Sequence, residues 1–155
     1  MKGNSEVISF LNKVLKMELT AVNQYFLHAK MAANWEYSDF AGKSREESID
    51  EMKHAEELID RILVLEGIPN LQDLGKLYIG EDLPEMVACD LRLEMEAIPL
   101  LRDAIVCCEQ ERDFVSRDLL AHILEDEENH VDWLEAQQHQ IEQMGVQNYL
   151  QSQRG

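Results

Sequence analysis

Two sets of glutamate and histidine residues recur at one fixed separation along this chain of 155 residues. Within each set, a single glutamate is followed 33 positions later by a Glu-x-x-His motif. Residues three positions apart project from one face of a helix, so each motif can direct a carboxylate and an imidazole at one metal ion. The doubled arrangement is typical of two facing helix pairs that hold two metal ions between them. The matching residues are all 76 positions apart: Glu18 and Glu94, Glu51 and Glu127, His54 and His130.

Each of these six residues falls on an apolar helical stripe. In the first stripe, Leu11, Glu18 and Tyr25 follow one another at seven-residue intervals, and in the third, Glu94 falls among residues such as Ile98. We therefore predict that all four carboxylates converge on the core. Ionised acids without partners would cost several kcal/mol each there. No Lys or Arg shares their level on these stripes, so two divalent cations are the expected counter-charge.

The ligand types indicate which metal this is. Coordination that is rich in carboxylates, free of thiolates and supplied with one histidine per metal suits iron or manganese better than structural zinc. We expect iron. Tyr25 shares the face of Glu18, where its phenol could bond a ligand carboxylate or could be a core aromatic with its hydroxyl satisfied elsewhere. The sequence leaves both possibilities open.

The composition excludes several classes of partner. The chain has 31 acidic and 14 basic residues, for a net charge of −17, which disfavours nucleic acid and anionic membranes. It has no apolar stretch long enough to span a bilayer and no secretory leader pattern, so we expect a cytoplasmic protein. The three cysteines lack metal-site spacing and are expected to be reduced thiols.

Apolar periodicity predicts four long helices and a short fifth one. Ser44 and Asp82 each precede a glutamate by three positions, as in a capping box that begins a helix. Gly67 and Gly145 fit positions just beyond helix ends. Pro99 falls inside the third helix, where we expect a kink. The predicted helices span residues 6–34, 44–66, 82–111, 113–144 and 146–151.

The connection over residues 67–81 is much longer than a helix hairpin requires. Fully extended, it would reach about 50 Å at ~3.3 Å per residue, whereas a helix of about 28 residues is roughly 42 Å long. It can therefore run the length of the bundle and make helices two and three parallel. We predict an all-α, ferritin-like four-helix bundle with this long crossover, a short C-terminal fifth helix and a single di-iron domain over residues 1–155.

Five longer stretches of the chain resemble the bacterioferritins, the haem-containing branch of the ferritin superfamily. The resemblance runs over nearly the whole chain. It implies a hollow octahedral shell of 24 subunits, homo-oligomeric or mixed with a second ferritin subunit. Inside it, Fe(II) would be oxidised by O2 or H2O2 and stored as a ferric mineral. The stretches are residues 23–28, 48–55, 65–72, 115–118 and 148–150.

The resemblance also implies a role for each residue of the doubled set. Glu18 and His54 would hold one iron, and Glu94 and His130 the other. Glu51 and Glu127 would bridge the two ions, and Tyr25 would belong to the same catalytic site.

Haem b and a reductase partner follow from the same resemblance. Met52 lies about 100° around its helix from the ligand face, on an apolar stripe that predicts a subunit interface. Two copies of its thioether could ligate a haem iron across a two-fold axis. A bacterioferritin-associated ferredoxin would dock near Ile68, Asn70, Leu71 and Glu81 and deliver electrons through the haem for iron release.

Three positions depart from the resemblance: Arg45, Glu46 and Pro99. Pro99 lies five residues after Glu94 and could shift the helix that carries this ligand. Arg45 and Glu46 stand where many relatives have Tyr-His, which changes a neighbour of the haem pocket and an inner-surface iron ligand. Glu46 is still a hard oxygen donor and Asp50 is retained, so both are possible inner-surface iron ligands. His28, His122 and His139 have no carboxylate partner at the ligand level, and we expect them at the surface or at an interface.

Other functions remain as alternatives. A di-iron peroxidase or oxygenase of the rubrerythrin kind usually carries a further ligand or an appended rubredoxin-like cysteine site, and neither is present in this sequence. A DNA-protecting mini-ferritin is disfavoured because the chain has no basic tail and its ligands form an intrasubunit set. A helical bundle without metal does not explain the doubled register.

Overall fold

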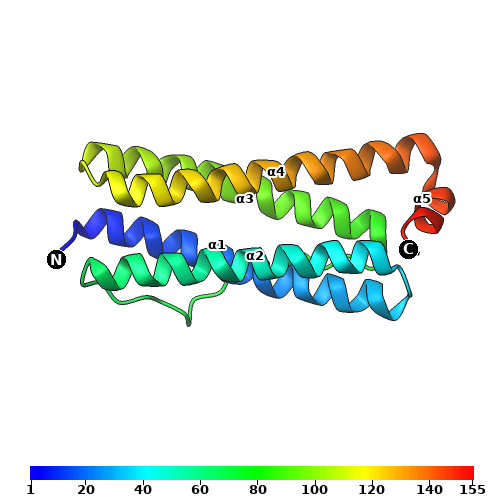
Figure 1. Ribbon diagram of the computed structural model, residues 1–155, viewed down its shortest axis with the longest axis horizontal. Helices are drawn as coiled ribbons and strands as arrows, with labels where there is room; N and C mark the ends of the chain where they lie inside the picture. Colours follow the sequence, from blue (N-terminus) through cyan, green and yellow to red (C-terminus); the bar gives the residue numbers. More distant parts are fainter.

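The computed structural model describes residues 1–155 and consists of helices and connecting segments without strands (Figure 1). Helix α1 packs against α2, and α3 packs against α4, as two antiparallel hairpins. The short α5 closes one end of the bundle. This architecture confirms the all-α, ferritin-like prediction. The helices are α1 (Ser5–Asn34), α2 (Ser38–Val64), α3 (Leu83–Gln110), α4 (Phe114–Met144) and α5 (Val146–Ser152).

The crossover over residues 65–82 runs along the bundle, so α2 and α3 point the same way (Figure 1). Polar side chains of α1 hold it in place. Asn12 donates to the Ile68 carbonyl at 3.1 Å and accepts from the Asn70 amide at 2.9 Å. Further along α1, Thr20 Oγ1 accepts from the Gly75 amide at 2.8 Å. The long connection is therefore a fixed strap on α1, which confirms the predicted topology.

Helix starts match the sequence prediction in one case and not in another. Asp82 caps α3, since its side chain accepts from the Glu85 amide at 2.9 Å. The predicted start at Ser44 is wrong: α2 begins at Ser38, and Ser44 is a buried residue inside it. Phe40 explains the extension, because its fully buried ring packs in the core at this end of the bundle. Burial of that ring favours six more helical residues, nearly two turns, before the capping-box motif.

Four of the helices are followed by a residue with positive φ. Gly145, between α4 and α5, has φ of 79° and fits the prediction. At the end of α2 the left-handed residue is Glu66, with φ of 62°, rather than Gly67. Gly67 is required for space instead: a Cβ there would lie 2.8 Å from a side-chain carbon of Ile8 and 2.9 Å from one of Ile62. Sequence alone placed the glycine correctly but misjudged its purpose.

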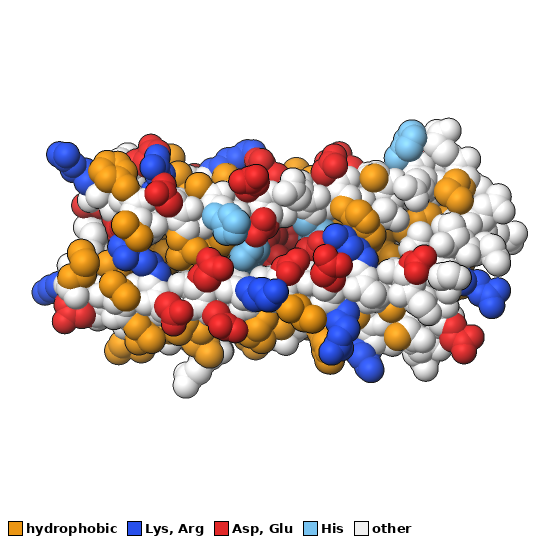
Figure 2. Space-filling model, viewed as in Figure 1, with side chains coloured by type: hydrophobic (Ala, Val, Ile, Leu, Met, Phe, Trp, Pro, Cys, Tyr) orange, Lys and Arg blue, Asp and Glu red, His pale blue; other side chains and the backbone are white.

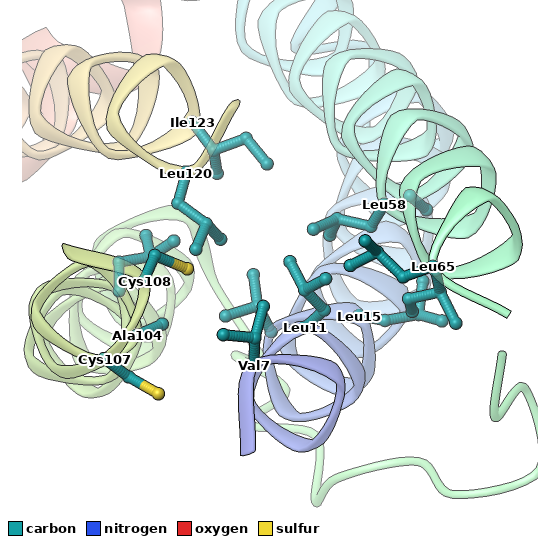
Figure 3. Close-up of a cluster of buried hydrophobic side chains, with 14 residues drawn as sticks. Val7, Leu11, Leu15, Leu58, Leu65, Ala104, Cys107, Cys108, Leu120 and Ile123 are labelled. Carbon is teal, nitrogen blue, oxygen red and sulfur yellow. The ribbon is translucent and has the colours of Figure 1, made fainter. Parts of the chain in front are cut away.

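Two apolar clusters fill the ends of the bundle. The larger, with 14 buried residues, includes Leu11, Leu58 and Leu120 (Figure 3). The smaller includes Phe40, Met86 and Tyr149. The doubled glutamate and histidine set lies between the two along every helix. The ligand layer is therefore clamped at both ends by close-packed side chains, which limit how far the helices can shift.

Three further features bear on the earlier expectations. Helix α3 continues through Pro99, and the kink there stays a prediction. All three cysteines are free thiols, and burial raises the pKa of Cys108 to about 12. No helix combines the length and the apolar character that a membrane crossing needs.

Candidate metal centre

Four helices bring the six residues of the doubled set into one buried layer. Glu18 comes from α1, Glu51 and His54 from α2, Glu94 from α3, and Glu127 and His130 from α4. Their ligand atoms form two groups, in each of which all atoms lie within 4.8 Å of one another. Glu127 belongs to both groups, which is the position of a bridging ligand. The first group is Glu18, Glu51, His54 and Glu127, and the second is Glu94, Glu127 and His130.

The imidazole of His54 faces three carboxylates. Its Nδ1 lies 3.4 Å from an oxygen of Glu18, 3.4 Å from one of Glu127 and 3.8 Å from one of Glu51. The opposite ring nitrogen, Nε2, lies 2.7 Å from Oδ2 of Asp126. His54 is thus held from both sides.

His130 is surrounded differently. Its Nδ1 lies 3.2 Å from Oε1 of Glu94 and 3.8 Å from an oxygen of Glu47. The edge of Tyr25 meets the His130 ring at a centroid distance of 5.0 Å, and Trp133 stacks on it at 6.2 Å. The Tyr25 hydroxyl donates to Glu94 Oε1. Of the two possibilities for Tyr25, the structure therefore shows the bond to a carboxylate of the site.

Burial and mutual repulsion perturb the acids of this layer. Burial first, and the charge of Glu127 second, raise the pKa of Glu18 to about 7. Burial and the Glu18 charge raise the pKa of Glu51 well above its ordinary value. Burial and the charge of Glu94 likewise raise the pKa of Glu127 well above its ordinary value. Burial acts on Glu94 as well, but hydrogen bonds with Glu127 and His130 outweigh it and lower its pKa. Protons on some of the acids thus reduce the repulsion.

The two histidines respond to the same negative field. Burial alone would lower the pKa of His54, but hydrogen bonds to Glu127, Glu18 and Glu51 outweigh it and raise the pKa. The pKa of His130 is also raised, because its bond to Glu94 outweighs the effect of burial. In the metal-free protein, imidazolium groups and carboxyl protons therefore balance part of the carboxylate charge. A bound cation would displace these protons.

Two carboxylate oxygens in this layer have no hydrogen-bond partner. They are Glu94 Oε2 and Glu127 Oε1, and both side chains are about 1% exposed. Buried polar atoms without partners are rare and costly in folded proteins. Oxygen donors left free among carboxylates and imidazoles match the donor set that iron or manganese takes. The residues present thus fit a pair of divalent cations.

A polar cavity of about 410 Å³ opens onto this layer between α2 and α4. On the face seen in Figure 2, red acidic and pale-blue histidine side chains gather in a hollow at mid-length between the two helix pairs. Its lining has no hydrophobic residue. Cations could therefore reach the layer from solvent through an acidic opening.

Two residues of this site were missed from sequence: Glu47, which is buried next to His130, and Asp126, which contacts His54. Both lie close to a residue of a Glu-x-x-His motif on the same helix. Glu47 is one turn before Glu51, and Asp126 immediately precedes Glu127. Their spacing was a usable signal, although an acidic chain offers many such neighbours.

The other side chains that were predicted to have a role differ in how deeply they are buried. Glu46 is exposed, whereas Asp50 is half-buried and lines the cavity. Met52 is 45% exposed and points away from the ligand layer, beside Ile49 at 46%. The expected surface position of His28 is wrong, because this side chain is fully buried. Its partners are Asp90 of α3 and the Gly80 amide of the crossover. Neither lies at the level of the metal ligands, so the repeat gave no sign of them.

Comparison with known proteins agrees with this fold and layer. The ferritin family model, described as a ferritin-like domain, matches residues 8–144. The chain therefore belongs to the ferritin family. It is 46% identical to bacterioferritin BfrA of Mycobacterium tuberculosis over 149 residues, which cover 96% of this chain and 94% of that protein. It is also 47% identical over 150 residues to the bacterioferritin of Streptomyces coelicolor, covering 97% of this chain and 90% of the relative.

A third relative extends the range of organisms. The bacterioferritin of Rhodobacter capsulatus is 46% identical over 149 residues, covering 96% of this chain and 92% of its own length. Identity at this level over nearly full length places the chain among the bacterioferritins within the ferritin family.

Proposed function

We propose that this protein is an iron-storage ferroxidase that oxidises Fe(II) in the layer between its four helices and retains the product inside a hollow shell. The observation that carries the proposal is the buried layer of four carboxylates and two imidazoles, in which two carboxylate oxygens have no hydrogen-bond partner. Membership among the bacterioferritins supports it. In this proposal Fe(II) is the substrate, and the shell holds the ferric product as cargo.

Each side chain would contribute to holding a pair of Fe(II) ions. Glu18 and His54 would bind one ion, Glu94 and His130 the other, and Glu51 and Glu127 would lie between them. Glu127 already belongs to both groups of ligand atoms. Two Fe(II) ions supply one electron each, and O2 or H2O2 accepts the pair, being reduced to H2O2 or water respectively. The carboxylates favour the more highly charged Fe(III), and therefore its formation.

Anaerobic protein mixed with Fe(II) and then with O2 or H2O2 in a stopped-flow spectrometer tests this function. We expect rapid formation of Fe(III) absorbance with either oxidant, and iron that co-elutes with a large assembly on size exclusion. Native mass would give the number of subunits, which we propose to be 24. Oxidation no faster than in buffer would contradict the proposal.

Haem b at a two-fold interface belongs to the same proposal. The half-exposed Met52 and Ile49 form an apolar patch on the outer face of α2, where two thioethers could meet. Met52→Leu conserves volume and apolarity but removes the sulfur ligand. We expect it to lose the haem Soret band while the shell still assembles. Met95→Leu, at a 56% exposed methionine of α3, is the matched control and should retain the band.

Iron release would use a ferredoxin that docks on the crossover. Ile68 is 85% exposed and Leu71 52% exposed there, with the acidic Glu81 further along the same segment. A small apolar surface with charged neighbours suits a transient interface. Ile68→Ala with Glu81→Ala should weaken ferredoxin binding in biolayer interferometry. Val106→Ala, at an equally apolar exposed position of α3, should leave it unchanged.

A further inference from the structure

The two halves of the metal centre are repeats in sequence but differ in the residues that support their histidines. His54 uses both ring nitrogens: Nδ1 faces the ligand carboxylates, and Nε2 lies 2.7 Å from Asp126 Oδ2. His130 uses Nδ1 in the same way but makes no hydrogen bond through Nε2 to another residue. Its ring is instead packed between Tyr25 and Trp133. Only His54 therefore has a polar partner on its outer nitrogen, Nε2.

The bond to Asp126 decides which nitrogen of His54 can act as a ligand. A carboxylate accepts hydrogen bonds, so the proton of Nε2 is the one that His54 donates to Asp126. The lone pair for a metal must then come from Nδ1, which is the atom that faces Glu18, Glu51 and Glu127. A carboxylate on the outer nitrogen fixes the ring and makes the ligand nitrogen more basic.

The two positions also differ in their number of ligand residues, and the position around His54 has more. The group around His54 contains four residues whose ligand atoms lie within 4.8 Å of one another, whereas the group around His130 contains three. In the second group, Glu94 Oε1 already accepts from the Tyr25 hydroxyl, which leaves Oε2 as the free oxygen of that carboxylate. The first position is thus better prepared to receive an ion.

The sequence repeat would not predict this inequality. Asp126 precedes Glu127, and Asp50 precedes Glu51 at the equivalent place 76 positions earlier. Yet Asp50 makes no hydrogen bond to His130, and it lies half-buried in the wall of the cavity. Only one of the two equivalent aspartates supports a ligand.

We propose that Asp126 is a positioning residue that orients His54 and makes the Glu18–His54 position the tighter of two unequal metal sites. This inference rests on the proposed metal centre. It implies that metal loads in order, first at His54 and then at His130. The half-filled centre would then be a defined species rather than a mixture of two.

An anaerobic titration of the metal-free protein with Co(II), followed by visible absorbance, tests the proposal without turnover. Wild type should bind two Co(II) per subunit in two resolved steps. Asp126→Ala should weaken the tighter step by about 10- to 100-fold, the usual effect of losing such an outer partner, and leave the weaker step unchanged. Asp126→Asn should lose less, because its amide oxygen can still accept from Nε2. Glu125→Ala, which removes an exposed acid from the same helix, is the control for charge alone.

A second comparison shows whether Asp126 acts through His54. In a His54→Ala background, Asp126→Ala should change Co(II) binding no further, whereas in a His130→Ala background it should keep its full effect. An equal loss at both steps, the same loss with Glu125→Ala, or unaltered binding by Asp126→Ala would overturn the inference while leaving the metal centre in place. Failure of wild type to bind Co(II) would overturn the metal centre as well.

Discussion

Two buried polar clusters lie next to each other in this bundle, and they differ in whether their buried polar atoms have hydrogen-bond partners. The first is the metal layer, with its four carboxylates. The second consists of Gln24 and His28, which lie six and ten residues after Glu18 on α1, and Asp90, which lies four residues before Glu94 on α3. Asp90 Oδ1 accepts from Gln24 Nε2 at 2.8 Å and pairs with His28 Nδ1 at 2.9 Å. The Tyr78 and Gly80 amides of the crossover complete it by donating to Gln24 Oε1 and His28 Nε2.

The difference between the two clusters separates a structural role from a functional one. In the second cluster no buried side-chain nitrogen or oxygen lacks a partner, and the bonds join α1, α3 and the crossover. In the metal layer, two buried oxygens have none. A network in which every buried polar atom is hydrogen-bonded stabilises the fold by itself. A network with unpaired buried atoms gains stability when a ligand binds to them. Four substitutions should affect the two clusters differently.

The largest effect should come from removing one terminal carboxylate of the metal layer. Glu18→Ala should slow Fe(II) oxidation by more than the roughly 10- to 100-fold that loss of an outer partner costs, because a direct ligand is gone. The metal-free protein should stay folded or gain stability, since burial and the charge of Glu127 already disfavour the ionised Glu18 carboxylate. Stopped-flow absorbance and thermal unfolding measure the two quantities. Wild-type oxidation rates would contradict the ligand assignment.

The second cluster should behave in the opposite way. Asp90→Ala leaves the donors of Gln24 and His28 without their acceptor. At roughly 1–3 kcal/mol for each, the loss of unfolding free energy should total roughly 2–6 kcal/mol. Co(II) binding below the unfolding transition should still reach two per subunit. Loss of metal binding with unchanged stability would remove the distinction between the clusters.

A pH dependence should appear in the metal-free protein because of Glu18. Its pKa is about 7 when folded, against an ordinary 4.5, so the folded state binds more protons than the unfolded one between these values. The stability that this group contributes is therefore complete below pH 4.5 and falls as the pH rises toward 7, by roughly 3 kcal/mol in all. Denaturant unfolding across this range should show a shallower decline in Glu18→Gln. The exposed Glu125→Gln variant should keep the wild-type slope.

The smallest effect should come from the hydroxyl that links the two regions. Tyr25 adjoins Gln24 in sequence and donates to Glu94 in the metal layer. Tyr25→Phe removes one hydrogen bond, worth about 1 kcal/mol, and keeps the buried ring. We expect a few-fold slower Fe(II) oxidation and little change in unfolding. A rate loss as large as that of Glu18→Ala would mean that the phenol takes part in the reaction itself.

The helices, the crossover and the six repeated residues of the metal layer could be predicted from the sequence. The 76-residue repeat places each Glu-x-x-His on an apolar stripe, and periodicity is a local property that needs no knowledge of the partner helix. The length of the connection after Gly67 was enough to make α2 and α3 parallel. Errors occurred where tertiary packing outweighs local signals, as at the start of α2, where burial of Phe40 overrides the motif at Ser44.

Contacts between segments far apart in the sequence could not be predicted, because they depend on how the helices pack. His28 is buried because α3 and the crossover bring it Asp90 and Gly80, which are 62 and 52 residues away in sequence. Asp126 reaches His54 across 72 residues, whereas its equivalent in the repeat, Asp50, makes no such bond to His130. Helical periodicity says which face a residue occupies, but not how near the facing helix comes. The two halves of the centre are therefore alike in sequence and unequal in space.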